Sequence, residues 1–308
     1  MLLIKPVKNL SGRGKFMPFE HIHESRRFAM ELSDQERMDF IRKDVLISTE
    51  HLRNVKLIAY NMIHIPRGCM EAPCLVVTAG SNYGKSTICN EIRGLNEDWC
   101  RKIRYVNFVR DTRNVRVRPR PGEKLMIALG LDPGKTGLDI GMVMEYCLAN
   151  DVRAIFMDEF QDSILQLSNQ EQLAFLSMLR GMCGPPTYMS FFVFGVGEAL
   201  NALQFDPQYV RRFEKYEVTP WQQVDSEYLN FLDTWESIMP LAMPSRLSSA
   251  ELSSAIYKKT EGVVGRICDL LKAAGAYAIS SGAEKITIEV LQRASKSKWL
   301  QEIPANSK

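Results

Sequence analysis

Residues 74–87 constrain the fold of this 308-residue chain more than any other part of its sequence. The apolar run Cys74-Leu75-Val76-Val77-Thr78 has the composition of a strand buried on both faces, and a helical pattern begins at Ile88. The nine residues between them, Ala79 to Thr87, match the phosphate-binding pattern G-x-x-x-x-G-K-[ST] except that Ala79 stands at the first glycine position. A strand, a glycine-rich loop and a helix in this order predict an α/β domain that binds a nucleotide.

Each residue type in this loop suits a polyphosphate. Backbone N–H groups of the loop and the next helix would surround the α- and β-phosphates, Lys85 would reach the β- and γ-phosphates, and Ser86 would bind Mg²⁺. The predicted ATP-binding residues are Ala79, Gly80, Ser81, Asn82, Tyr83, Gly84, Lys85, Ser86 and Thr87. A chance Gly-Lys-Ser at a strand-to-helix turn is the alternative. Ala79 affects only the first turn of the loop, because a methyl group fits wherever φ is negative.

A second apolar run ends in two adjacent carboxylates. Ala154-Ile155-Phe156-Met157 is followed by Asp158 and Glu159. Asp158 is expected to bind Mg²⁺ together with Ser86, and Glu159 to orient and activate an attacking water, so ATP hydrolysis is the predicted reaction. Apolar runs often end in Asp-Glu, so this motif alone does not indicate a catalytic site. It does so in combination with the phosphate-binding loop that precedes it.

The order of apolar runs and helical patterns predicts the domain organisation. Further runs at 103–109 and 191–196, with helices between the runs, predict a parallel sheet flanked by helices. After residue 218 only helical patterns remain, near 222–238, 248–260, 263–281 and 287–296. A capping box from Ser33 to Glu36 predicts a helix start, whereas residues 1–30 are expected to form an extended arm. We therefore predict an N-terminal arm and first helix (1–50), an α/β ATPase core (51–218) and a C-terminal helical lid (219–308).

Composition excludes several classes of protein. Hydrophobic residues make up 45% of the chain and charged residues 24%, which is typical of a globular protein and unlike a disordered chain or a coiled coil. No stretch approaches the roughly 18 apolar residues of a membrane span, so we expect a cytoplasmic protein without a membrane partner. The seven cysteines form no C-x-x-C pair and are expected to be buried thiols. His21 and His23 could in principle hold a metal, but neither a later histidine nor a paired cysteine completes a ligand set, and the four histidines are expected to be solvated or capping residues.

Residues 101–120 carry the strongest local charge of the chain. They contain eight basic residues and one acid, a net charge of +7, whereas the whole chain carries +3. The predicted DNA-binding residues are Arg104, Arg113, Arg116, Arg118 and Arg120. The spacing of the last four, two or three residues apart, indicates an extended loop that contacts the phosphate backbone of duplex DNA without reading bases. A solvated basic loop is the alternative.

Arg211 and Arg212 form a third candidate element of the catalytic site. They follow the apolar run at 191–196, and hydrolysis of this type is accelerated by an arginine that meets the γ-phosphate, often from a neighbouring subunit. A solvated helix end is the alternative for this pair.

This combination resembles the AAA+ ATPases over roughly residues 50–300, and within them the TniB/TnsC transposition ATPases. The strings that carry the likeness are Ile65-Pro66-Arg67, Gly80-Ser81-Asn82 with Gly84-Lys85-Ser86, Met157-Asp158-Glu159, Gly195 to Leu200 with Asn201-Ala202-Leu203, Arg211-Arg212-Phe213 and Pro220-Trp221. The resemblance implies a regulator of transposition that forms a ring or filament on duplex DNA, marks target DNA and recruits or activates a transposase. It also implies disassembly driven by ATP hydrolysis and a TniQ-type target-selection protein as a further partner.

The resemblance also bears on Arg266 and on the pair Val196-Gly197. It implies a phosphate contact for Arg266 of the lid, for which a surface arginine is the alternative. It implies a Thr or Asn at the end of the fourth strand, where Val196-Gly197 offers neither a hydroxyl nor an amide, so turnover is expected to be weakened. Two other functions therefore stay open: a helicase-loader or initiator-like AAA+ ATPase, and a nucleotide-bound polymerising scaffold with little turnover.

Overall fold

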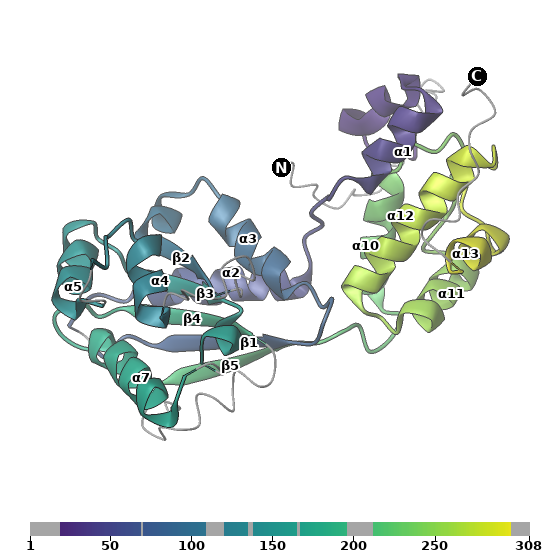
Figure 1. Cartoon of the computed structure of the whole chain (residues 1–308). Coiled ribbons are helices and arrows are strands. Elements are labelled where there is room, and N and C mark those ends of the chain that lie inside the picture. The colour runs from purple at the N-terminus through teal and green to yellow at the C-terminus, as the bar shows by residue number, and fades with distance from the viewer. Residues whose placement is uncertain are drawn as a thin grey trace. The chain divides into compact units, whose positions relative to one another are not determined.

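The computed structural model of the chain contains two compact units. One unit is His51–Val218, and the other combines Met1–Glu50 with Thr219–Lys308. The structure describes residues 19–68, 70–108, 120–134, 138–164, 167–195 and 212–296. Figure 1 shows the sheet of the first unit and the helices of the second.

Within the described residues, a five-stranded parallel sheet forms the centre of the first unit (Figure 1). The strands are β1 (Cys74–Ala79), β2 (Ile103–Asn107), β3 (Ala154–Asp158), β4 (Ser190–Gly195) and β5 (Phe213–Val218). Their spatial order is β2-β3-β4-β1-β5, and every neighbouring pair is parallel. The parallel sheet flanked by helices confirms the predicted fold class.

Burial explains why the sequence reveals four of these strands and hides the fifth. Every residue of β1, β3 and β4 is buried, which is the environment that a continuous apolar run predicts. β5 lies at an edge and exposes Glu214, Lys215 and Glu217. Charges on an edge strand discourage pairing with other chains, and they also remove the apolar run, so the sequence analysis did not predict this strand.

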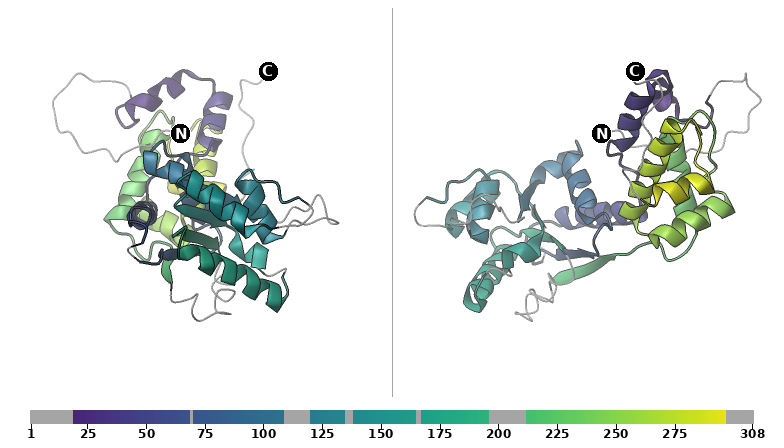
Figure 2. Two further views of the ribbon diagram at one scale, coloured as in Figure 1. Left: turned by 90° about the vertical axis from the view of Figure 1, so that its left-hand side faces the viewer. Right: turned by 45° about the vertical axis from the view of Figure 1, so that its right-hand side comes forward.

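Helices pack on both faces of the sheet (Figures 1 and 2). The crossover from β1 to β2 runs across the sheet in the opposite direction to the crossovers from β2 to β3 and from β3 to β4. Because such crossovers are right-handed, α3 lies on one face and α4, α5 and α7 lie on the other. The helices of this unit are α2 (Glu50–Ile63), α3 (Lys85–Gly94), η2 (Asp98–Lys102), α4 (Pro121–Ala128), α5 (Ile140–Ala149), α6 (Phe160–Ile164) and α7 (Asn169–Cys183).

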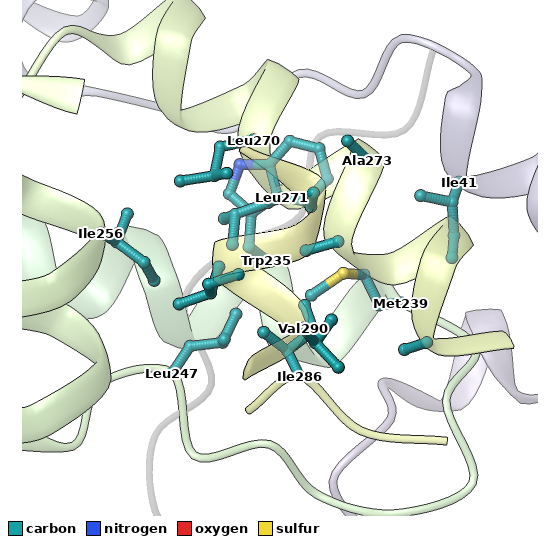
Figure 3. Close-up of a cluster of buried hydrophobic side chains, with 14 of the residues drawn as sticks. Ile41, Trp235, Met239, Leu247, Ile256, Leu270, Leu271, Ala273, Ile286 and Val290 are labelled. Carbon is teal, nitrogen blue, oxygen red and sulfur yellow. The ribbon is translucent and has the colours of Figure 1, made fainter. Parts of the chain in front are cut away.

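The second unit is helical and has its own hydrophobic core (Figure 3). Its later helices all lie within the predicted ranges: α10 (Ser226–Ile238), α11 (Ala250–Thr260), α12 (Val264–Ser280) and α13 (Ile288–Ala294). α1 (Asp34–Arg42) begins with the predicted capping box between Ser33 and Glu36. The Trp235 side chain lies at the centre of the core and is 1% exposed.

The N-terminal helix α1 packs against α12 of this helical unit. A Cβ atom on Gly275 would lie 3.1 Å from Cδ1 of Ile41 and 3.2 Å from the sulfur of Met239, so glycine permits this close approach. Arg37 of α1 is buried and donates to both carboxylate oxygens of Glu284 and to the carbonyl of Pro240. These contacts attach the start of the described chain to its C-terminal helices.

Residues 24–31 differ from the extended arm that the sequence predicted. They form a 3-10 helix, η1 (Glu24–Glu31), with His23 at its N-cap. The His23 N–H donates to the carbonyl of Ser237 at 2.7 Å, and Nε2 of His21 lies 3.0 Å from the carbonyl oxygen of Leu241. The prediction of an extended arm is therefore wrong for this segment. Contacts with α10 and the loop after it hold the segment in place, and such contacts leave no pattern in the local sequence. Residues 1–18 lie outside the described residues.

Candidate active site

The predicted phosphate-binding loop connects β1 to α3. Ala79 is the last residue of β1, where it pairs with Val218 and is buried. Gly84 at the N-cap of α3 has a φ of 87°, and Asn82 has a φ of 65°. Both residue types tolerate this left-handed region. Ala79 belongs to the strand rather than to the turn, so its methyl group does not disturb the loop.

The ring of Tyr83 lies against Gly80 of the same loop. A Cβ atom on Gly80 would lie 2.9 Å from Cζ of Tyr83, so this arrangement of the ring requires glycine at that position. Gly80, Ser81 and Asn82 are exposed. The backbone of the loop is therefore accessible from the surface.

Lys85 begins α3 and contacts a residue that follows β3. Its side chain is 8% exposed, and Nζ lies 3.4 Å from Oε2 of Glu159. The two residues meet because the carboxyl ends of parallel strands open at the same edge of a sheet. A buried ammonium group requires an opposite charge, and here the Glu159 carboxylate supplies it.

Asp158 and Ser86, the two predicted metal-binding residues, are in contact. Asp158 is the last residue of β3 and is 8% exposed. Its Oδ1 accepts a hydrogen bond of 3.0 Å from the Glu159 N–H, and its carboxylate also accepts one from the Ser86 hydroxyl. Burial raises the pKa of Asp158, while these hydrogen bonds and the Lys85 ammonium act in the opposite direction. A buried carboxylate in this position favours a nearby cation.

Gln161 belongs to the same group, although the sequence analysis did not predict it. It lies in α6, is 7% exposed, and donates from Nε2 to Oε2 of Glu159 at 2.5 Å. Its Oε1 is buried and has no hydrogen-bond partner among the described residues. Gln161 carries no charge and belongs to none of the sequence motifs described above, so no pattern pointed to it. The one available signal was its place two residues after Glu159.

Of the predicted arginines that the structure describes, Arg212 lies outside this group, and Arg266 belongs to the helical unit. Arg212 forms an ion pair of 2.5 Å with Glu71 and donates to the carbonyl of Arg180 at 3.2 Å. Arg266, near the start of α12, is half exposed and pairs with Glu261 at 2.5 Å. Arg211 and the pair Val196-Gly197 lie outside the described residues.

Two of the five predicted DNA-binding arginines are described. Arg104 donates to the carbonyls of Arg101 and Ile103, and its guanidinium lies 5.9 Å from the ring centroid of Tyr146. Arg120 precedes α4, is 74% exposed, and lies 3.8 Å from a carboxylate oxygen of Glu171. The remaining three predicted arginines, Arg113, Arg116 and Arg118, lie outside the described residues.

The cysteines in the described part of the chain are unpaired, as the sequence predicted. Six cysteines are free thiols, and five of them are buried. No group of three or more His, Cys, Asp and Glu residues could hold a metal ion within the described ranges. The described helices also include none that is long and apolar enough to cross a membrane.

Solved structures share this fold. The ORC2 protein of Aeropyrum pernix, in ADPNP-ADP complexes, matches with a TM-score of 0.58 and 13% identity, over 86% of this chain and 72% of that chain. The ADP form of the same protein gives a TM-score of 0.57 and 14% identity, over 84% of this chain and 72% of that chain. At these identities the likeness concerns the fold alone, which is that of the AAA+ ATPases.

Residues 138–223 match the family model described as bacterial TniB protein. This segment is similar to TniB, and the chain that contains it has the AAA+ fold. The matched segment contains β3, β4 and β5, and it includes both Asp158 and Glu159. No curated protein sequence matches the chain.

Proposed function

We propose that this protein binds ATP at residues 79–87 and hydrolyses it. The observation that carries the proposal is the meeting of Lys85, Ser86, Asp158 and Glu159 at one edge of the sheet. The exposed loop backbone and the N-terminus of α3 would hold the phosphates. Lys85 would neutralise the β- and γ-phosphates, and Glu159 would accept a proton from the attacking water.

The residues present fit a Mg²⁺ ion bound together with the nucleotide. Ser86 and Asp158 place a hydroxyl and a buried carboxylate in contact, and both are oxygen ligands of the kind that Mg²⁺ takes. These two protein ligands would leave further positions for phosphate and water oxygens. When bound, Mg²⁺ would offset the negative charge of the phosphates.

For the arginine that acts on a neighbouring subunit we propose Arg211 rather than Arg212. The guanidinium of Arg212 is already held by Glu71 and by the carbonyl of Arg180 in its own unit. An arginine that reaches another subunit must be able to leave such contacts, and breaking this ion pair and hydrogen bond costs free energy. In this proposal Arg212 anchors the start of β5, and Arg211 supplies the positive charge to the active site of the neighbouring subunit. A phosphate contact by Arg266 would likewise require it to leave Glu261.

The wider role that we propose is regulation of DNA transposition. The protein would oligomerise on duplex DNA, mark the target DNA and recruit a transposase, with ATP hydrolysis driving disassembly. The match to the TniB family supports this role, and the net charge of +7 in residues 101–120 supports contacts to a phosphate backbone. A TniQ-type protein would select the target.

Two experiments separate this proposal from its alternatives. Phosphate release with and without duplex DNA distinguishes a DNA-stimulated ATPase from a nucleotide-bound scaffold, which would release none above background. Pull-down with a transposase, in the presence of DNA and a slowly hydrolysed ATP analogue, distinguishes a transposition regulator from a helicase loader. Release unaffected by DNA, together with no transposase captured, would reject the proposed role.

A further inference from the structure

The contacts of Glu159 single out Gln161 as a residue with a role in the reaction. We infer that Gln161 is a positioning residue that holds the Glu159 carboxylate in place when ATP phosphates have drawn Lys85 away. This inference rests on the proposed ATPase function, because it concerns the same site. It assigns a role to a residue that belongs to no sequence motif recognised above.

One oxygen of the Glu159 carboxylate has two partners. Its Oε2 lies 3.4 Å from Nζ of Lys85 and 2.5 Å from Nε2 of Gln161. The Glu159 backbone has a φ of 52° and donates its N–H to Asp158. The backbone conformation fixes the direction in which the Glu159 side chain leaves the main chain, and the two contacts of Oε2 fix the position of its carboxylate.

The two partners of Glu159 are expected to respond differently to a nucleotide. Lys85 is a cation, and phosphates that carry several negative charges compete with a single carboxylate for its ammonium group. Gln161 is neutral, so the same phosphates attract it far less. Once Lys85 turns to the phosphates, Gln161 is the partner that remains on Oε2.

The side-chain amide of Gln161 is buried. The side chain is 7% exposed, and its Oε1 has no hydrogen-bond partner among the described residues. The Gln161 amide must direct its N–H group towards the Glu159 carboxylate, because the amide oxygen in the same position would repel the carboxylate. The fold thus keeps a buried acceptor unpaired while the donor stays on Glu159, an arrangement that is expected at functional sites.

The experiment compares Gln161→Leu with Gln161→His and with a matched control. Leucine keeps most of the volume and removes the donor, whereas histidine retains an N–H at a similar reach. The control is Gln172→Leu, since Gln172 is also 7% exposed with an unpaired Oε1 but donates to the carbonyls of Ile164 and Leu167. Measurements are kcat and KM for ATP hydrolysis, the Kd of a fluorescent ATP analogue, and thermal unfolding.

We expect Gln161→Leu to lower kcat by about tenfold or more, the cost of one hydrogen bond to a charged group, with KM and Kd within about twofold. Gln161→His should recover most of the lost kcat, and Gln172→Leu should keep the parental kcat. Parental kcat in Gln161→Leu, an equal loss in Gln172→Leu, or a rise in KM in place of the fall in kcat would overturn the inference. If Gln161→Leu does not fold, Gln161→Met takes its place with the same expectations. A parent protein without ATPase activity would instead reject the proposed function itself.

Discussion

At the scale of single residues, the site depends on which anion Lys85 contacts. In the structure its ammonium group lies 3.4 Å from Glu159, and both residues lie at the edge where the loop after β1 is exposed. An ion pair at this distance gives the carboxylate and the ammonium a partner when no nucleotide is bound. The proposed function therefore requires Lys85 to exchange Glu159 for phosphates.

Replacement of Lys85 tests this exchange. Lys85→Ala should weaken ATP binding by about tenfold or more, because a charged hydrogen-bond donor to the phosphates is lost. Lys56→Ala is the matched control, since Lys56 pairs with Glu97 in the same unit and has no assigned role. Titration with a fluorescent ATP analogue measures both affinities. Equal ATP affinity in the parent and in Lys85→Ala would exclude residues 79–87 as the nucleotide site.

The sequence predicts residues of the site only where chemistry fixes their spacing. Lys85 and Ser86 follow from the loop pattern, and Asp158 and Glu159 follow from a strand that ends in carboxylates. Gln161 could not be predicted in this way, because its role comes from a distance in space to Oε2 of Glu159. Likewise, nothing in the sequence showed that Arg212 is held by Glu71, which lies far from it along the chain.

At the scale of secondary-structure elements, segments with an apolar run or a helical period were predictable, the edge strand β2 among them, and segments without such a pattern were not. β1, β3 and β4 are apolar along their whole length, and helices α10 to α13 carry helical periodicity. β5 and η1 lack these signals, because their positions depend on pairing with β1 and on contacts with α10. Local pattern therefore predicts an element only where that element buries its own apolar face.

The attachment of α1 to the helical unit gives a prediction of stability. Arg37→Met should lower the free energy of unfolding by about 3 kcal/mol, because the Arg37 guanidinium is buried and its loss leaves Glu284 without its ion-pair partner. The control Arg42→Met, on the same helix with a more exposed partner in Asp39, should cost less than about 1 kcal/mol. Urea unfolding at neutral pH measures both values. Similar losses in the two variants would contradict this account of Arg37.

The same ion pair predicts a dependence of stability on pH. Burial alone would raise the pKa of Glu284, but hydrogen bonds from Arg37 and the Ala242 N–H hold that pKa below its ordinary value. The ion pair therefore stabilises the fold above the ordinary pKa of glutamate, and this contribution is lost as the pH falls towards the lowered value. Between pH 6 and pH 4, the parent should lose more of its free energy of unfolding than Glu284→Gln. Equal losses in urea unfolding would show that Glu284 does not contribute to acid sensitivity.

At the scale of the whole molecule, the account requires subunits that complete one another's active sites. Arg211→Ala should keep ATP binding and lose DNA-stimulated hydrolysis, whereas Arg212→Ala should lower stability through the lost contact with Glu71. Mixtures of Arg211→Ala and Lys85→Ala subunits should recover part of the activity, because some interfaces join an intact loop to an intact arginine. Phosphate release across a range of mixing ratios measures this recovery. Activity that never exceeds the sum of the separate variants would leave Arg211 without a role in the neighbouring site.

DNA binding is also expected to be a property of the assembled protein. Replacement of Arg118 and Arg120 by alanine should weaken binding similarly for unrelated duplex sequences, and the slope of log affinity against log salt should become shallower by about 1.8. Lys258→Ala together with Arg246→Ala, two exposed cations of the helical unit, should leave the slope unchanged. Fluorescence anisotropy at several salt concentrations measures the slopes. An unchanged slope for the Arg118 and Arg120 variant would contradict the backbone contact, and a loss for one sequence alone would indicate contacts to bases.

The most direct test of the central claim is single-turnover ATP hydrolysis by Glu159→Gln beside the parent protein. The claim is that Glu159 activates the attacking water while Lys85, Ser86 and Asp158 bind the nucleotide and its cation. Glu159→Gln should therefore bind ATP in the presence of Mg²⁺ with nearly parental affinity and hydrolyse it at least about a hundredfold more slowly, as expected when a general base is lost. Hydrolysis by Glu159→Gln at the parental rate would contradict the account, because the residue that activates water would then lie elsewhere.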